Sequence, residues 1–310
     1  MGFTISANDL TTGAPPLSED DVNRLIFQES TQVLREGGRL VFGHRWKIGG
    51  VMHYLASKAR DLRRWRRRWS DEEPETSEPA IINVLAWNDL PPAADGKSDA
   101  ERAANELIAE GVLKIEFKQA AGIELDVAEV NSDLGKYCRI RSLTEMRRRI
   151  AELSDARICL GGGANKPERR LSGVLEEVIL AIQMDKPLYL ASALGGVSKL
   201  IVDAILGRKI SGADADQFFT PEPACQVMRK FRERYPYPIE EGPSVPCAAA
   251  TGEWDALRFL QEYPLERLCD NARLDRDDLI NLMTTAVYDR AMALASIGID
   301  QIQRHVGSAT

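Results

Sequence analysis

Residues 157–196 read RICLGGGANKPERRLSGVLEEVILAIQMDKPLYLASALGG and contain one unit twice, an apolar run that ends in glycines. The first run ends at residues 161–163 and the second at residues 195–196. Between them, Ser172 and Gly173 predict the start of a helix with Glu176 and Glu177 in its first turn. Glycines after a strand let the backbone approach an anion, and a helix start presents N–H groups and the positive end of its dipole. The stretch therefore predicts a phosphate-binding turn.

The two carboxylates have a second interpretation, because acidic residues in the first turn also stabilise a helix through its dipole. The glycine spacing matches neither GxxxxGK[ST] nor GxGxxG, the fingerprints of P-loop proteins and of NAD-binding Rossmann domains. The pattern therefore disfavours a standard kinase, ATPase or NAD dehydrogenase.

Strands and helices alternate along the first two thirds of the chain. Helices are predicted over residues 18–35, 51–68, 100–110 and 143–153, and strands over residues 39–43, 81–87 and 113–117 and from residue 157. This alternation predicts an α/β fold with a doubly wound, mainly parallel sheet. Glycine turns follow three of the strands, so we expect them to converge at the carboxyl edge, where such sheets bind ligands.

The composition changes after residue 210, where six prolines between positions 221 and 246 separate shorter helices. We therefore expect two parts. Residues 1–210 would form a Rossmann-like domain, and residues 211–310 a helical C-terminal extension that packs on it.

With 44% hydrophobic residues and no long apolar run, the 310-residue chain is typical of a soluble globular protein. Its start lacks the basic and apolar regions of a secretory signal, so we expect a cytoplasmic location and no membrane partner. Five cysteines without CxxC spacing suit reduced thiols. The three histidines, His44, His53 and His305, form no ligand pattern, so we predict no metal and no cofactor.

One basic tract, RDLRRWRRR at residues 60–68, interrupts a net charge of −7. It is either a solvated helix end or a patch for a polyphosphate, an RNA or an acidic partner. Trp65 and Trp69 would share one face of that helix, which packs on the core or faces outward. The acidic net charge disfavours nucleic acid as a partner.

Six segments carry a resemblance to a known family. They are GGRLVFGHRWKIGGVMHYL, INVLAW, SLTEMRR, RICLGGG, RRLSGVLEEVILAI and KPLYLASALGG. In order and spacing they resemble the SLOG superfamily, most of all its prokaryotic LSDAT branch, which is related to the N-terminal domains of melastatin-type TRP channels. The superfamily also includes the Lonely Guy phosphoribohydrolases. The resemblance implies a modified Rossmann fold that binds nucleotide-derived ligands, with sensing or N-glycosidic cleavage as its output.

Carried over to this sequence, the resemblance implies ligand contacts from Gly43, His44, Arg45, Gly49, Gly50, Gly161, Gly162, Gly163, Arg170, Ser172, Gly173, Glu176, Glu177, Gly195 and Gly196. For an enzyme it implies catalytic roles for Glu176, Glu177 and Arg147. The chain departs from the family pattern at His44 and Arg45, which replace Gly-Asp, and at Ser172, which replaces Pro. The PGGxGT form of the hydrolases is absent. These departures favour binding over hydrolysis.

We therefore expect a sensor of ADP-ribose, cyclic ADP-ribose or an NAD-related compound. It would form a homo-oligomer and act with a separate effector protein in bacterial anti-phage defence or signalling. The alternative is a stand-alone N-glycosidic hydrolase of the phosphoribohydrolase type, acting on a nucleotide or nucleoside.

Overall fold

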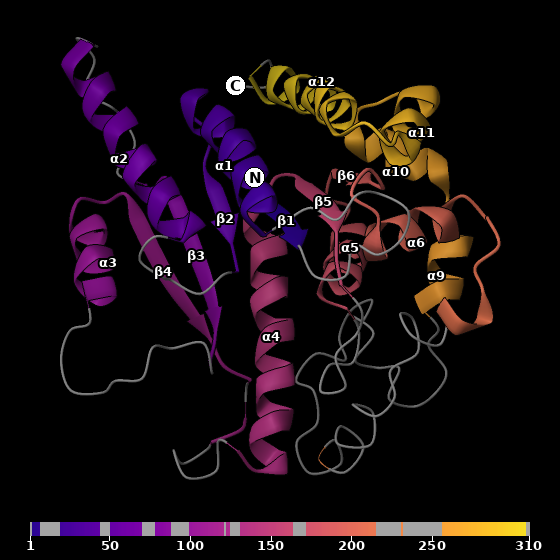
Figure 1. Cartoon of the computed structure of the whole chain (residues 1–310), viewed down its shortest axis with the longest axis horizontal. Coiled ribbons are helices and arrows are strands. Elements are labelled where there is room, and N and C mark those ends of the chain that lie inside the picture. Colours follow the sequence, from indigo (N-terminus) through magenta and orange to yellow (C-terminus); the bar gives the residue numbers. More distant parts are fainter. Residues whose placement is uncertain are drawn as a thin grey trace.

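A computed structural model of the chain describes residues 2–6, 19–43, 50–69, 78–87, 99–120, 122–124, 131–163, 172–214, 231 and 256–307. A six-stranded sheet forms its centre (Figure 1). The strands are β1 (Gly2–Ser6), β2 (Leu40–Phe42), β3 (Ile81–Ala86), β4 (Leu113–Lys118), β5 (Arg157–Gly161) and β6 (Leu188–Ala191). They lie in the order β4-β3-β2-β1-β5-β6, and all neighbouring pairs are parallel. The predicted α/β fold with a parallel sheet is confirmed.

The central strand, β1, was missed by the sequence analysis. Its residues, Gly-Phe-Thr-Ile-Ser, do alternate between small or polar and apolar types, but over only five positions. β1 pairs with β5 from Gly2–Arg157 to Ser6–Gly161, and with β2 at Gly2–Val41. It therefore joins the two halves of the sheet through contacts between residues far apart in the chain.

Alternate side chains of β2 and β3 face two different helical layers. Val41, Ile82 and Val84 form a buried cluster with residues of α4 (Asp133–Leu153), whereas Leu40 and Ile81 belong to the core shared with α1 (Glu19–Arg35) and α2 (Val51–Trp69). α3 (Asp99–Ala109) continues the α1–α2 layer, and α5 (Gly173–Gln183) lies beside α4. Figure 1 shows α1 and α4 on opposite sides of the strands. The sheet is therefore doubly wound.

Helix α4 begins ten residues earlier than the predicted start at residue 143. Ser132 caps it, because its Oγ accepts a hydrogen bond of 3.0 Å from the N–H of Gly135. Buried residues occur on nearly all sides of α4, which weakens the amphipathic period that sequence analysis depends on. Gly135 near its start further lowers the local helix propensity.

The chain changes direction between β1 and β5. It builds β1 to β4 outward on one side, returns through α4, and adds β5 and β6 on the other side. Open α/β sheets bind ligands at such a switch point, in the crevice outside the carboxyl ends of the strands. The glycine turn after β5 lies at this point.

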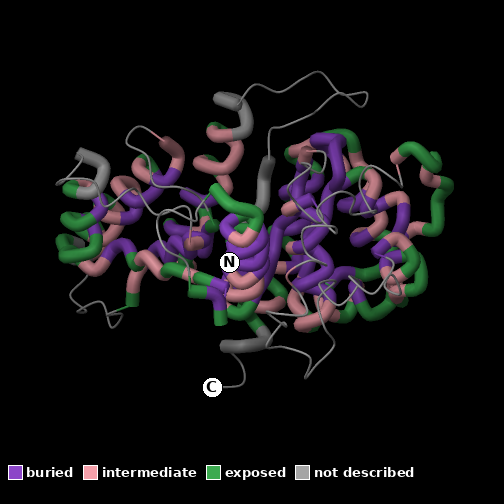
Figure 2. The backbone as a smooth tube through the Cα atoms, turned by 90° about the horizontal axis from the view of Figure 1, so that it is seen from below, coloured by how far each residue is buried: buried purple, intermediate pink, exposed green. Residues whose placement is uncertain are grey.

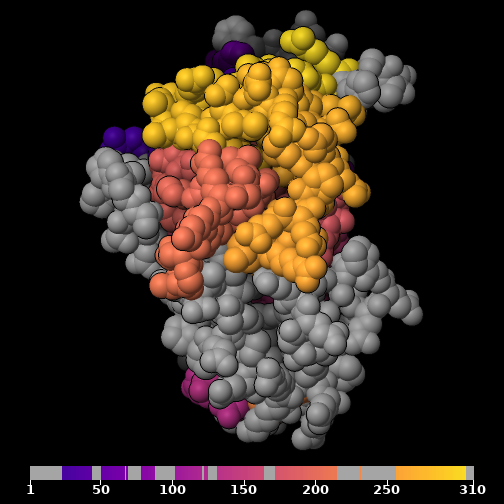
Figure 3. All heavy atoms as spheres, turned by 90° about the vertical axis from the view of Figure 1, so that its right-hand side faces the viewer, coloured from indigo at the N-terminus to yellow at the C-terminus, as the bar shows by residue number. Residues whose placement is uncertain are grey.

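The helices that follow β6 gather on the side of the molecule that Figure 3 shows, and they contact β6 and one another. They are α6 (Gly196–Ile205), α9 (Ala256–Glu262), α10 (Leu265–Ala272), α11 (Arg276–Thr284) and α12 (Tyr288–Gly307). The Tyr189 hydroxyl of β6 donates to the carbonyl of Ala272 at 3.0 Å, and the N–H of Ser192 donates to the carbonyl of Met283 at 3.1 Å. Leu268 and Leu282 belong to the same core cluster as the strands. The division into domains at residue 210 stays a prediction.

Buried residues run through the middle of the molecule, and exposed residues line its rim (Figure 2). Among the helices that the structure describes, none is long and apolar enough to cross a membrane.

Candidate functional site

The turn after β5 has a backbone that favours glycine. Gly161 and Gly162 have φ angles of 66° and 99°, in the left-handed region that other residues rarely adopt. A Cβ added to Gly162 would lie 2.8 Å from Cγ2 of Val174, so α5 also approaches this turn closely. Gly163 follows and is half-buried. The turn therefore brings bare backbone to the carboxyl edge of the sheet.

Helix α5 begins at this edge, as the sequence predicted. Ser172 is its N-cap, and the Ser172 Oγ accepts a hydrogen bond of 3.2 Å from the N–H of Leu175. The first intrahelical bond runs from the N–H of Glu176 to the carbonyl of Ser172 at 3.0 Å. The N–H groups of Gly173 and Val174 precede that ladder and lie at the positive end of the helix dipole.

The turn after β6 packs directly on the turn after β5. Gly195 and Gly196 have φ angles of 65° and 63°, and a Cβ on Gly196 would lie 2.3 Å from the carbonyl oxygen of Gly162. The N–H of Val197, in the first turn of α6, donates to that carbonyl at 3.0 Å. Close packing of two turns therefore explains the glycine at 196, and the left-handed φ explains the glycine at 195. Ligand contact by these two glycines stays a prediction.

β2, the strand before the third predicted glycine turn, ends earlier along the sheet than β5 does. β2 ends at Phe42, level with Ile158 by the register, whereas β5 continues to Gly161. A Cβ on Gly43 would lie 2.7 Å from Cδ1 of Ile150 in α4, so packing against α4 accounts for this glycine. Gly50 begins α2, because its carbonyl accepts from the N–H of Tyr54 at 3.2 Å. The other predicted contacts, His44, Arg45, Gly49 and Arg170, lie outside the described residues.

The two carboxylates of α5 are held by arginines from two other elements. Glu176 accepts hydrogen bonds from Nη1 of Arg147 and from Oγ1 of Thr144, both in α4. Glu177 accepts from Nη2 of Arg157, the first residue of β5, and its Oε1 lies 3.6 Å from Nε of Arg147. The side chains of Arg147 and Arg157 are 7% and 2% exposed. Two guanidinium groups and two carboxylates therefore form a buried, charge-balanced ion network.

This network supports the start of α5. A Cβ added to Gly173 would lie 2.9 Å from Nη2 of Arg147, so the guanidinium packs against the first residue of the helix. The structure thus brings Glu176, Glu177 and Arg147 together in one ion network, and their catalytic or ligand-binding roles stay predictions. Sequence analysis missed Thr144 and Arg157. A charged residue at the head of the otherwise apolar run RICLG was a usable signal for Arg157.

The strand order, the glycine turn at the switch point and the capped helix behind it define a Rossmann-like domain. The chain belongs to the SLOG family: the family model described as SLOG cluster2 matches residues 2–243. Comparison with curated proteins and with solved structures gave no match. Family membership indicates a nucleotide-related domain, and the assignment to the LSDAT branch stays a prediction.

Proposed function

We propose that this chain binds and senses a nucleotide-derived ligand, such as ADP-ribose, cyclic ADP-ribose or an NAD-related compound. The observation that carries the proposal is the Ser172-capped start of α5 beside Gly161 and Gly162 at the switch point. Two helical N–H groups and bare glycine backbone meet there, which is the arrangement that holds a phosphate. SLOG membership supports a nucleotide as the source of that phosphate.

Sensing is favoured over cleavage by the state of the two carboxylates. Cleavage of an N-glycosidic bond needs a carboxylate that reaches the sugar or activates a water. Glu176 is 7% exposed and has both carboxylate oxygens bonded, one to Thr144 and one to Arg147. Such a carboxylate is suited to holding α4 and α5 together beside the glycine turn, and Glu177 adds β5 through Arg157. In this proposal a separate effector protein reads out ligand binding, in a defence or signalling system.

A negative charge introduced at the cap tests the site. Ser172→Asp should keep α5 capped, because aspartate is as good an N-cap as serine, but its carboxylate should repel a phosphate at the same helix end. At a ligand concentration of about 100 times the Kd, the wild type should gain roughly 2.7 kcal/mol in a thermal-shift assay. The variant should lose that gain. Ser132→Asp, the same change at the exposed cap of α4, is the matched control and should bind like the wild type.

Chromatography of the incubated nucleotides separates sensing from cleavage. A sensor returns each ligand intact. Release of a free base or a ribose phosphate by the wild type, lost in Glu176→Gln or Glu177→Gln, would instead support the N-glycosidic hydrolase. Ligand binding by Ser172→Asp as tight as that of the wild type would place the ligand elsewhere.

A further inference from the structure

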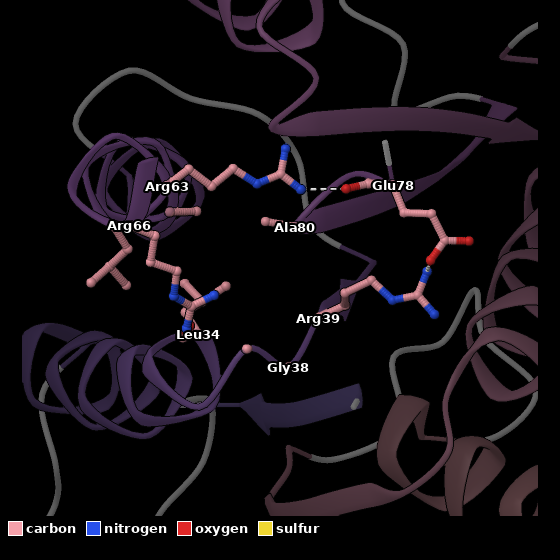
Figure 4. Close-up of a pocket in the computed structure, with 10 residues that line it drawn as sticks. Leu34, Gly38, Arg39, Arg63, Arg66, Glu78 and Ala80 are labelled. Atoms are coloured by element: carbon pink, nitrogen blue, oxygen red, sulfur yellow. Dashed lines mark hydrogen bonds and ion pairs between the residues drawn. The ribbon is translucent and has the colours of Figure 1, made fainter. Parts of the chain in front are cut away.

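A separate cavity lies at the opposite, amino-terminal edge of the sheet (Figure 4). It has a volume of about 160 Å³ and is enclosed by the end of α1, the second half of α2 and the starts of β2 and β3. Its lining includes Arg39, Arg63, Arg66 and Glu78. The cavity therefore contains part of the basic tract at residues 60–68.

Two arginines of the tract are held in place by backbone carbonyls. Nη2 of Arg66 donates to the carbonyls of Leu34 and Arg35, at the end of α1, at 3.1 and 2.6 Å. Nη1 of Arg63 donates to the carbonyl of Gly111 at 2.8 Å, and its Nη2 donates to the carbonyl of Glu78. Figure 4 shows the two side chains leaving α2 in different directions, one toward Glu78 and one toward Leu34. Their guanidinium groups are thus fixed before any ligand arrives.

Among the described residues that line the cavity, cationic side chains outnumber anionic ones. They are three guanidinium groups and the carboxylate of Glu78, which forms an ion pair with Arg39. Both hydrogen bonds that Arg66 forms with described residues use Nη2 and end on neutral carbonyls, so within this part of the chain its Nη1 and Nε are available as donors. Gly37 lies beside Nη1, and a Cβ added there would contact it at 3.7 Å, so the glycine leaves this nitrogen less covered than any other residue would.

The other wall of the cavity is apolar. Leu34, Ala59, Leu62 and Ala80 line it, and an apolar wall strengthens the attraction between a bound anion and the fixed guanidinium groups. The volume far exceeds the roughly 10–15 Å³ that one water needs. It is also well below the roughly 300 Å³ at which pockets for drug-sized ligands begin.

We propose that this cavity is a second ligand site, which binds a phosphate or diphosphate group through Arg63 and Arg66. The planar guanidinium fork matches phosphate oxygens, and two fixed forks with an excess positive charge select a dianion over chloride. The phosphate is either a free anion or the exposed end of a larger molecule. The site lies at the opposite strand ends from the α5 turn, so its occupation is independent of the function proposed above.

Calorimetric titration of the intact chain with inorganic pyrophosphate tests this proposal. The wild type should bind saturably and lose affinity as the salt concentration rises. Arg66→Ala removes a phosphate ligand but also uncaps α1, so circular dichroism must show that it is folded. Ala80→Leu should also remove the phosphate site, because it fills the cavity with an apolar side chain while every arginine is kept. Each variant should weaken pyrophosphate binding by about tenfold or more.

Arg64→Ala is the matched control. Arg64 lies in the same tract but points to Glu110 at 3.2 Å, is exposed and does not line the cavity. It should retain the wild-type affinity, and so should Ser172→Asp. Equal loss in Arg64→Ala, unchanged binding in both Arg66→Ala and Ala80→Leu, or no saturable binding by the folded wild type would overturn the proposal. Competition by ADP would show that the phosphate is accepted as part of a nucleotide, and its failure that the free anion is the occupant; either result supports the site.

Discussion

Replacing Arg147 by methionine should destabilise the protein by about 3–5 kcal/mol, because it leaves a buried carboxylate without its cation. The side chains of Arg147 and Glu176 are 7% and 9% exposed. Without the guanidinium, Thr144 is the one hydrogen-bond partner that Glu176 keeps among the described residues. Methionine preserves length and helix propensity, so the loss reports the charge. Urea denaturation followed by circular dichroism measures it.

A double-mutant cycle with Glu176→Gln isolates the pair. The double variant removes both charges and leaves Arg157 with Glu177, so it should lose about 1–3 kcal/mol less than the sum of the single losses. An exposed pair provides the comparison. Arg258 and Glu262 lie 2.7 Å apart with side chains 73% and 64% exposed, and their coupling should stay below about 1 kcal/mol.

The two coupling energies test whether burial strengthens the ion pair. Losses that add within about 0.5 kcal/mol at Arg147 and Glu176 would mean that the two groups do not act as a pair. Equal coupling in the two cycles would mean that burial contributes nothing to this network.

Two further predictions concern stability. Arg149 donates to the Glu116 carboxylate at 2.9 Å and holds its pKa at about 2, below the ordinary 4.5. A carboxyl group with a lowered pKa stabilises the fold above pH 4.5, and this stabilisation is lost as the pH falls toward 2. Glu116→Gln should therefore cost about 1–2 kcal/mol at pH 7, after allowance for solvent screening. In urea titrations at pH 2 the same variant should cost much less. Gly196→Ala should destabilise by at least about 2 kcal/mol more than Gly207→Ala in thermal denaturation. The two glycines have φ angles of 63° and 64°, but an added Cβ meets the Gly162 carbonyl at 2.3 Å in the first case and nothing within 4 Å in the second. Equal losses of stability in the two variants would mean that the cost comes from backbone strain alone and not from the contact with Gly162.

Sequence analysis predicted the elements whose signals are local. α1, α2 and the strands β3 to β6 were found because their apolar period or run is continuous and a cap, glycine or proline marks the end. The same local chemistry located the start of α5 at Ser172. It failed where burial removes the period, as in the first half of α4, and at β1, which has only two large apolar residues, whereas the shorter β2 and β6 are continuous apolar runs.

Which charged groups would pair, and where the glycine turns would lie, was decided only by the tertiary structure. The sequence contains many arginines, and nothing near Arg157 or Arg147 in the chain indicates that they meet Glu177 and Glu176. Such partners depend on the packing of α5 against α4 and β5, which brings together residues 20 and 29 positions apart. The basic tract shows the same division: the sequence determines its charge, but only the ends of α1 and the turn at Gly111 determine where Arg66 and Arg63 point.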